Sequence, residues 1–220
     1  MTALARYVIA RCLTSQRWVP PITIFALASA VFFTAGGDAT GAGSISALLL
    51  VPTTTWMTIS ALHVDDPSQV AVVGTKVGSM LRARVGTLAT VLSSALVLAV
   101  LSGVGAVTTD PHHGGVDGIA GTAAGLLLID VMCVCSGVVL GQLCARPLVR
   151  RAGFSWSLAA LGNVALVAVP GSPLVVVLRA LSAHGPARSW ATMVLLSGIL
   201  LGVEAAVFVI TLLAVRRRAA

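Results

Sequence analysis

The chain has 220 residues, of which 57% are hydrophobic and only 10% are charged. A water-soluble domain carries about 25% charged residues, so this composition excludes an ordinary soluble globular protein. The net charge of +7 comes almost entirely from arginine, and the placement of these arginines indicates membrane topology rather than nucleic-acid binding.

Chain length limits the number of membrane-spanning helices. A helix that crosses a bilayer needs roughly 20 apolar residues. Six such helices with short loops fill the chain and leave no room for a separate soluble domain. We therefore predict an all-α polytopic membrane protein in which residues 1–220 form one transmembrane domain.

The first 17 residues mix basic and apolar side chains. Leu4, Val8 and Cys12 recur at a spacing of four, which predicts an amphipathic helix over residues 1–17 that lies on the cytoplasmic membrane surface. A cleaved signal peptide is the alternative interpretation, because an alanine-rich stretch follows.

Six apolar segments follow, separated by polar stretches. The predicted spans are 20–36, 42–62, 85–107, 119–145, 156–181 and 190–215. With the N-terminus inside, every lysine and arginine except Arg179 and Arg188 falls on one side of the membrane. Cytoplasmic loops are enriched in basic residues, so we expect a plasma-membrane protein with both termini in the cytoplasm.

The polar stretch between the second and third spans begins with helix-start signals. Asp66 suits the N-cap, Pro67 suits the first helical position, and Gln69 completes a capping box. Apolar residues follow at three- and four-residue spacing: Val70, Val73, Val77 and Leu81. This pattern predicts an amphipathic helix over 65–82, which either connects two spans or docks into a cytoplasmic partner.

This region resembles a known family. The residues concerned are Trp56-Met57-Thr58-Ile59, then Asp65-Asp66-Pro67-Ser68-Gln69, then Gly78 and Arg82. They are similar to the membrane subunits of type-two ABC exporters, in which an acidic-acidic-x-x-Gln segment begins the cytoplasmic helix after the second span. The order of an interface helix, six spans and a broken fifth span is also similar. Family members carry more acidic residues in this loop, where this chain has His63.

The resemblance implies a permease subunit of an ATP-driven exporter and not an enzyme. Two such subunits, identical or different, would pair within the lipid membrane, and each would contact a separate ABC ATP-binding subunit. The implied contacts are Asp65, Asp66, Pro67, Gln69, Val73 and Lys76. ATP and Mg²⁺ are expected on that partner, because this sequence has no G-x-x-x-x-G-K-[ST] phosphate loop. No cofactor, metal or nucleic acid is expected on this chain.

Two acidic residues fall inside predicted spans, Asp130 in the fourth and Glu204 in the sixth. Acids within a membrane are costly and are candidates for function, and with Arg179 near the outer surface they are the candidate pathway residues. They could relay protons in a secondary transporter, or be protonated and hydrogen-bonded within the bundle or line a substrate cavity. A membrane enzyme or assembly factor without transport is a further hypothesis.

Pro170, Gly171 and Pro173 interrupt the fifth span after about 14 residues, or about 21 Å, which is short of the roughly 30 Å hydrocarbon core. The apolar residues 174–181 then predict a re-entrant helix in the outer leaflet, with a proline kink in a continuous helix as the alternative. Three glycine pairs have the spacing that allows close helix approach, within the bundle or between subunits: Gly121/Gly125, Gly137/Gly141 and Gly198/Gly202.

Overall fold

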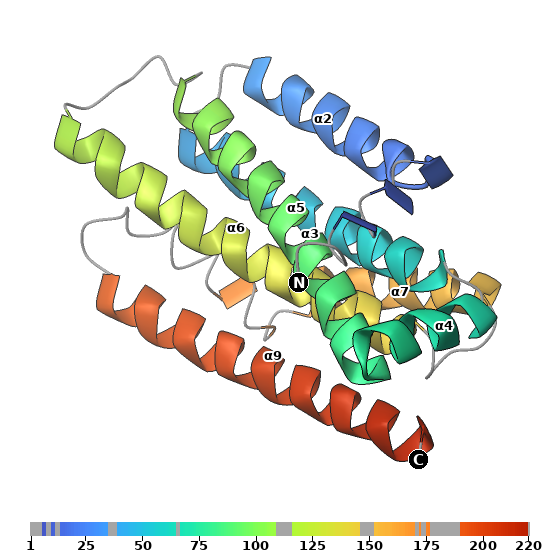
Figure 1. The fold of residues 1–220 in the computed structure, drawn as a ribbon. Helices are drawn as coiled ribbons and strands as arrows, with labels where there is room; N and C mark the ends of the chain where they lie inside the picture. The colour runs from blue at the N-terminus through green and yellow to red at the C-terminus, as the bar shows by residue number, and fades with distance from the viewer. Residues whose placement is uncertain are drawn as a thin grey trace.

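The computed structural model describes residues 6–7, 10–11, 14–34, 39–64, 67–108, 116–145, 152–169, 172, 175–176 and 190–219. Within these ranges the protein is all-α, which confirms that part of the predicted fold class (Figure 1). Seven helices are defined there: α2 (Val19–Thr34), α3 (Ala39–His63), α4 (Pro67–Val77), α5 (Met80–Thr108), α6 (Val116–Cys144), α7 (Ala152–Ala168) and α9 (Trp190–Ala219).

Among the described residues, three stretches are long and apolar enough to cross a membrane. They are Thr40–His63 of α3, Leu81–Thr108 of α5 and Ala120–Cys144 of α6. At 1.5 Å per residue each is at least about 36 Å long, which exceeds the roughly 30 Å hydrocarbon core. The apolar parts of α2, α7 and α9 are shorter. These three candidate spans suggest a membrane protein.

The centre of the bundle is the contact between α3 and α6. α5 packs against both of these helices, α2 against α3, α7 against α6 and α3, and α9 against α6 (Figure 1). Leu50 and Val51 of α3 and Ile129 and Met132 of α6 are fully buried in this core. A membrane helix that is apolar on all sides can bury one face in this core and expose the opposite face to lipid.

Glycines allow α3 and α6 to approach closely. A Cβ added at Gly137 would lie 1.9 Å from Oγ1 of Thr54, and one added at Gly141 would lie 2.6 Å from Cβ of Thr58. Thr55 also donates a hydrogen bond from Oγ1 to the carbonyl oxygen of Gly137, at 3.1 Å. This glycine pair therefore packs within the chain rather than between subunits. We call the contact the α3–α6 seam.

A chain of buried hydroxyl groups joins α3 to α2 and α5. Ser46 of α3 lies 3.2 Å from Ser29 of α2 and 2.5 Å from Ser102 of α5, measured between the Oγ atoms. Each hydroxyl can donate one hydrogen bond and accept another, so the three groups satisfy one another inside an apolar bundle.

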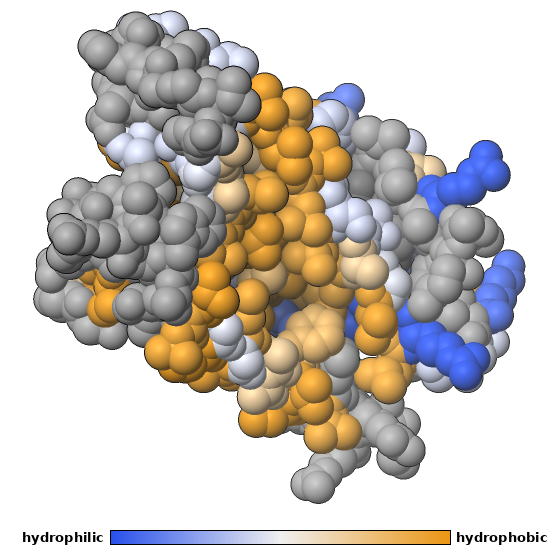
Figure 2. Space-filling model, turned by 90° about the vertical axis from the view of Figure 1, so that its left-hand side faces the viewer, coloured by the Kyte–Doolittle hydropathy of each residue, from blue (hydrophilic) through white to orange (hydrophobic). Residues whose placement is uncertain are grey.

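Large apolar side chains cover much of the surface. On α5, Val97, Val100, Leu101 and Val104 are each at least half exposed. Figure 2 shows hydrophobic side chains across the middle of one face and hydrophilic ones toward one edge. Exposure of this kind would be unfavourable in water, but acyl chains solvate such side chains without cost.

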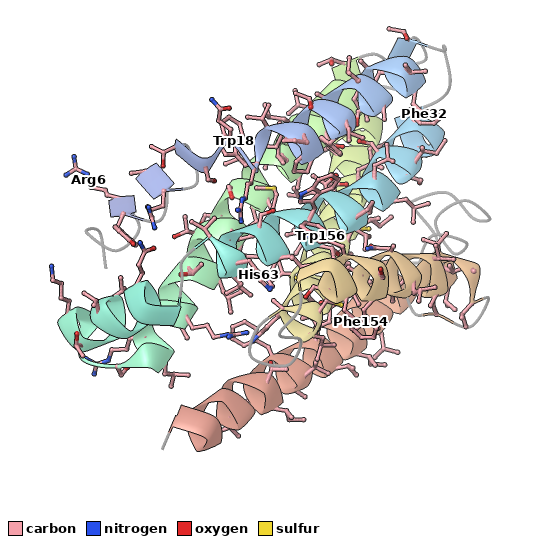
Figure 3. All side chains as sticks on the ribbon, turned by 90° about the vertical axis from the view of Figure 1, so that its right-hand side faces the viewer. Arg6, Trp18, Phe32, His63, Phe154 and Trp156 are labelled. Carbon is pink, nitrogen blue, oxygen red and sulfur yellow. The ribbon has the colours of Figure 1, made fainter. Side chains whose placement is uncertain are left out.

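One end of the bundle carries the described exposed basic side chains, which are Arg6, Arg17, Lys76 and Arg82. It is formed by the start of α2, the end of α3, α4 and the start of α5, and we call it the basic end. Figure 3 shows Arg6 and His63 toward this end, with Phe32 at the opposite end of α2. The basic end corresponds to the side that the sequence predicts to be cytoplasmic.

The predicted helix over 65–82 is wrong in its extent. α4 ends at Val77, Gly78 adopts φ 85°, and α5 begins at Met80. The Oγ of Ser79 accepts a hydrogen bond from the backbone N–H of Arg82 at 3.1 Å, which is an N-cap for the new helix. The apolar spacing of Val77 and Leu81 continues across this turn, so periodicity alone did not reveal it.

Candidate functional site

The residues predicted to be functional fall in two regions, α4 at the basic end and the acids within the bundle. In α4, Gln69, Val72 and Lys76 are exposed and share one helix face, because they are three and four residues apart. Val73 is half-buried at the margin of this face, four residues after Gln69, and Gly74 is buried. The side chains of Asp65, Asp66 and Pro67 lie outside the described part of the structure.

Arg11 contacts the outward face of α4. Its NH2 group donates a hydrogen bond to Oε1 of Gln69. Arg17 reaches the carbonyl oxygen of His63, at the end of α3, at 3.5 Å. A positive charge at a helix C-terminus is favourable, because the helix dipole is negative there. These two contacts link the N-terminal segment to the end of α3 and to α4.

The segment Trp56-Met57-Thr58-Ile59, which carries part of the family resemblance, is a packing element. The ring of Trp56 lies edge-on to that of Trp156 of α7, with centroids 5.1 Å apart and planes at 65°. Met57, Thr58 and Ile59 are buried. These residues hold α3 in the bundle and do not lie on the exposed face of α4.

Glu204 joins α9 to α6. Its Oε1 accepts a hydrogen bond from the hydroxyl group of Ser136, and the Glu204 side chain is only 8% exposed. The second carboxylate oxygen has no hydrogen-bond partner among the described residues. The sequence analysis missed Ser136, because a serine in an apolar helix usually bonds to its own backbone. Thr53 does so here, with the carbonyl oxygen of Leu49 at 2.7 Å.

Asp130 faces α5 rather than α9. The side chain is 1% exposed, and Oδ2 lies 3.7 Å from the point where a Cβ on Gly103 would stand. Neither carboxylate oxygen has a hydrogen-bond partner among the described residues. A buried carboxylate without a partner is unfavourable, so Asp130 needs a proton or a cation to balance its charge.

The two acids occupy different helix contacts. Asp130 and Ser136 are six residues apart on α6, which corresponds to about 9 Å along the axis and about 120° around it. Asp130 therefore faces α5, whereas Glu204 bonds to the α9 side of α6. Among the described residues, no hydrogen-bonded chain connects the two carboxylates.

The break after α7 has a described hydrogen-bond pattern. Ser172 donates from Oγ to the carbonyl oxygen of Leu166 at 2.7 Å, and its Oγ accepts from the backbone N–H of Val175 at 3.2 Å. Ser172 thus ends one helical segment and caps the next. Pro170, Gly171, Pro173 and Arg179 lie outside the described residues.

No group of three or more His, Cys, Asp or Glu side chains that could hold a metal ion is found in the described ranges. Comparison with protein-family models, with curated proteins and with solved structures finds no match for this chain. The described residues form an all-α fold with three candidate membrane-spanning helices, which suggest a membrane protein.

Proposed function

We propose that the protein is the membrane-spanning permease subunit of an ATP-driven exporter, coupled to a separate ABC ATP-binding subunit. The supporting observation is α4, a short helix at the basic end that lies between two candidate spans and exposes Gln69, Val72 and Lys76. The resemblance of Asp65-Asp66-Pro67-Ser68-Gln69 to the cytoplasmic helix of type-two ABC exporters agrees with this placement. On this proposal the basic end lies in the cytoplasm of the cell and both termini are on that side.

The proposed topology has six spans, formed by α2, α3, α5, α6, α7 and α9. α7 is the first half of a broken fifth span, since its 17 residues cover about 26 Å and end at the turn capped by Ser172. The predicted re-entrant second half, residues 174–181, lies outside the described residues except for 175–176. The predicted interface helix over residues 1–17 falls partly outside the described residues, and it cannot include Gln16, which adopts φ 52°. The bond between Arg11 and Gln69 holds this N-terminal segment beside α4.

The position of α4 suggests how movement of the partner ATP-binding subunit is transmitted to the membrane helices. α4 is connected to α3 through residues 64–66 and to α5 through the turn at Gly78. A push on α4 is therefore transmitted to two helices that both pack against α6. ATP and Mg²⁺ are bound by the partner, and a second permease subunit, identical or different, completes a pathway that includes Asp130, Glu204 and Arg179.

Site-specific photo-crosslinking tests the docking role of α4. A photoreactive phenylalanine analogue at Val72, which is 56% exposed, should capture one chain that contains a phosphate loop. Co-purified complexes should hydrolyse ATP, and Gln69→Ala with Lys76→Ala should lower the yield of this complex about tenfold. The matched control is the same analogue at Thr34, which is exposed at the opposite end of α2. Equal capture at the two positions, or capture without any ATP-binding chain, would refute the proposal.

A proton-coupled secondary transporter is the second candidate, favoured by the buried, unbonded carboxylate of Asp130 and by the bond between Ser136 and Glu204. In that case a proton gradient alone should drive substrate uptake into vesicles that contain only this chain. Asp130→Asn should abolish the uptake, because an amide cannot take up and release the proton. Transport that requires ATP and resists a proton uncoupler would exclude this candidate.

A further inference from the structure

Four helices form an apolar layer close to the basic end. Met57 of α3, Leu88 of α5 and Val138 of α6 are buried together, and Phe208 of α9 packs against them. α3, α6 and α9 run toward the basic end, whereas α5 runs away from it, so the next turn of each helix toward that end can be read from the sequence. Residues three or four apart share a helix face and therefore point toward the same space.

The next turn of three of these helices is polar. Ser60 follows Met57 by three residues on α3, Arg84 precedes Leu88 by four on α5, and Gln142 follows Val138 by four on α6. Ser60 is 6% exposed and Gln142 is 1% exposed, while Arg84 is half-buried. Three polar side chains from three helices therefore face one region beside the apolar layer. We call this group the basic-end polar cluster.

The polar atoms of this cluster are buried without partners. Nε and NH2 of Arg84, both amide atoms of Gln142 and Oγ of Ser60 have no hydrogen bond among the described residues. Buried polar groups in folded proteins are almost always hydrogen-bonded, and a buried guanidinium without a counter-charge is especially unfavourable. A bound molecule that carries acceptor oxygens would satisfy these groups, which lack partners in the described part of the chain.

We propose that Ser60, Arg84 and Gln142 bind the oxygens of a phosphate group. The guanidinium of Arg84 presents N–H donors in a planar fork that matches two phosphate oxygens, and it supplies the compensating charge. The amide Nε2 of Gln142 and the hydroxyl group of Ser60 add two further donors. The amide oxygen of Gln142 can accept a hydrogen bond from a hydroxyl group next to the phosphate, as in a glycerol headgroup.

The depth of the site fits a phosphate at the membrane surface. Arg84 is the fifth residue of α5 and lies just after the turn at Gly78, where the chain enters its candidate span. Basic pockets between membrane helices on the cytoplasmic side bind anionic headgroups. Exposed Arg17, Lys76 and Arg82 at the same end raise the local concentration of anions. The occupant is thus the headgroup of an anionic phospholipid or a free phosphate, and this inference does not depend on the proposed transport function.

Lipid binding to the purified full-length protein tests this site. The protein in a neutral detergent is titrated with phosphatidylglycerol, with phosphatidylcholine and with inorganic phosphate, and binding is followed by native mass spectrometry and by thermal unfolding. Both lipids carry a phosphate, but the choline of phosphatidylcholine cancels its charge and brings a cation toward Arg84. We therefore expect phosphatidylglycerol to bind at least about tenfold more tightly than phosphatidylcholine. Stabilisation by inorganic phosphate at millimolar concentration would identify free phosphate as the ligand, and stabilisation by phosphatidylglycerol alone would identify a lipid.

Variants locate the binding to the cluster. Arg84→Gln should weaken binding of the preferred phosphate ligand about tenfold, whereas Arg82→Gln, which removes an exposed arginine two residues away, should change it less than about twofold. Arg84→Lys keeps the charge but loses the planar fork, so it should weaken binding several-fold at unchanged stability of the ligand-free protein. If Arg84→Gln does not fold, the lysine variant alone decides the question. Equal losses for Arg82→Gln and the Arg84 variants, or no preference for any phosphate ligand, would overturn the proposal.

Discussion

The glycine pairs of α6 and α9 have the same spacing but opposite surroundings. A Cβ on Gly137 or Gly141 would run into Thr54 or Thr58 of α3. A Cβ on Gly198 or Gly202 would meet no heavy atom of the described residues within 4 Å. The comparison shows that the four-residue spacing allows a close contact without creating one. The seam exists because α3 presents threonines, which are small enough to fill the groove that the α6 glycines leave.

The largest effect is expected from Gly137→Ala. The new methyl group would stand 1.9 Å from Oγ1 of Thr54 and 2.6 Å from the carbonyl oxygen of Val51, and that backbone atom cannot rotate away. We expect a loss of about 1–3 kcal/mol in the free energy of unfolding, as for other overpacked cores. Thermal unfolding in detergent would measure it.

Gly202→Ala on α9 is the matched control for this substitution. It should be neutral or slightly stabilising, because alanine favours a helix by about 1 kcal/mol over glycine. If both variants lost the same stability, the environments of the two glycine pairs would not differ as the structure indicates.

The next effect is expected from Glu204→Ala, which tests how α9 is held to the bundle. The substitution removes the hydrogen bond between α6 and α9, and Ser136 can then bond to its own backbone, so we expect a loss of about 1 kcal/mol. Relative to the unsubstituted protein, hydrogen exchange should become faster for the α9 amides and change less for the α6 amides. The lost bond joins α9 to α6, and α6 is also held by α3 and α5. Glu204→Gln keeps an acceptor oxygen and should retain most of the stability. Equal losses for the alanine and glutamine variants would mean that charge, and not the hydrogen bond, is what matters at this position.

Three of the six spans predicted from the sequence are found as long apolar helices, because the length of an apolar run is a local property. The segments 42–62, 85–107 and 119–145 correspond to the three long helices α3, α5 and α6. Gly78 was a readable signal for the end of α4, since glycine is the residue that most easily adopts a positive φ. The apolar spacing across it favoured one longer helix, and that prediction was wrong.

The surroundings of the candidate site residues could not be predicted from the sequence in the same way. Asp130 and Glu204 were identified as intramembrane acids, but their separation onto the α5 and α9 sides of α6 depends on how three helices pack. Arg84 entered the sequence analysis only as one of the basic residues that set the topology. The proposed pairing of Arg84 with Gln142 depends on how α5 and α6 pack together, and neither helix encodes that register alone.

Thr55→Val gives the smallest expected effect. It separates the contribution of hydrogen bonding from that of close packing at the α3–α6 seam. Valine has nearly the shape of threonine, so close packing is kept while the 3.1 Å hydrogen bond to the carbonyl oxygen of Gly137 is lost. The hydroxyl group also bonds to the carbonyl oxygen of Val51 in its own helix, at 2.8 Å. Interhelical hydrogen bonds in membranes average about 0.6 kcal/mol, so we expect a loss of that size in thermal unfolding.

Thr53→Val is the control for this substitution, because its hydroxyl group bonds to Leu49 within α3, and we expect a smaller loss. A Thr55→Val loss as large as that of Gly137→Ala would mean that the hydrogen bond, and not close approach, joins α3 to α6. The expected ranking, with Gly137→Ala well above Thr55→Val, would instead attribute the seam mainly to packing. The α9 glycines then differ from the α6 glycines because no complementary helix packs against them within the described residues.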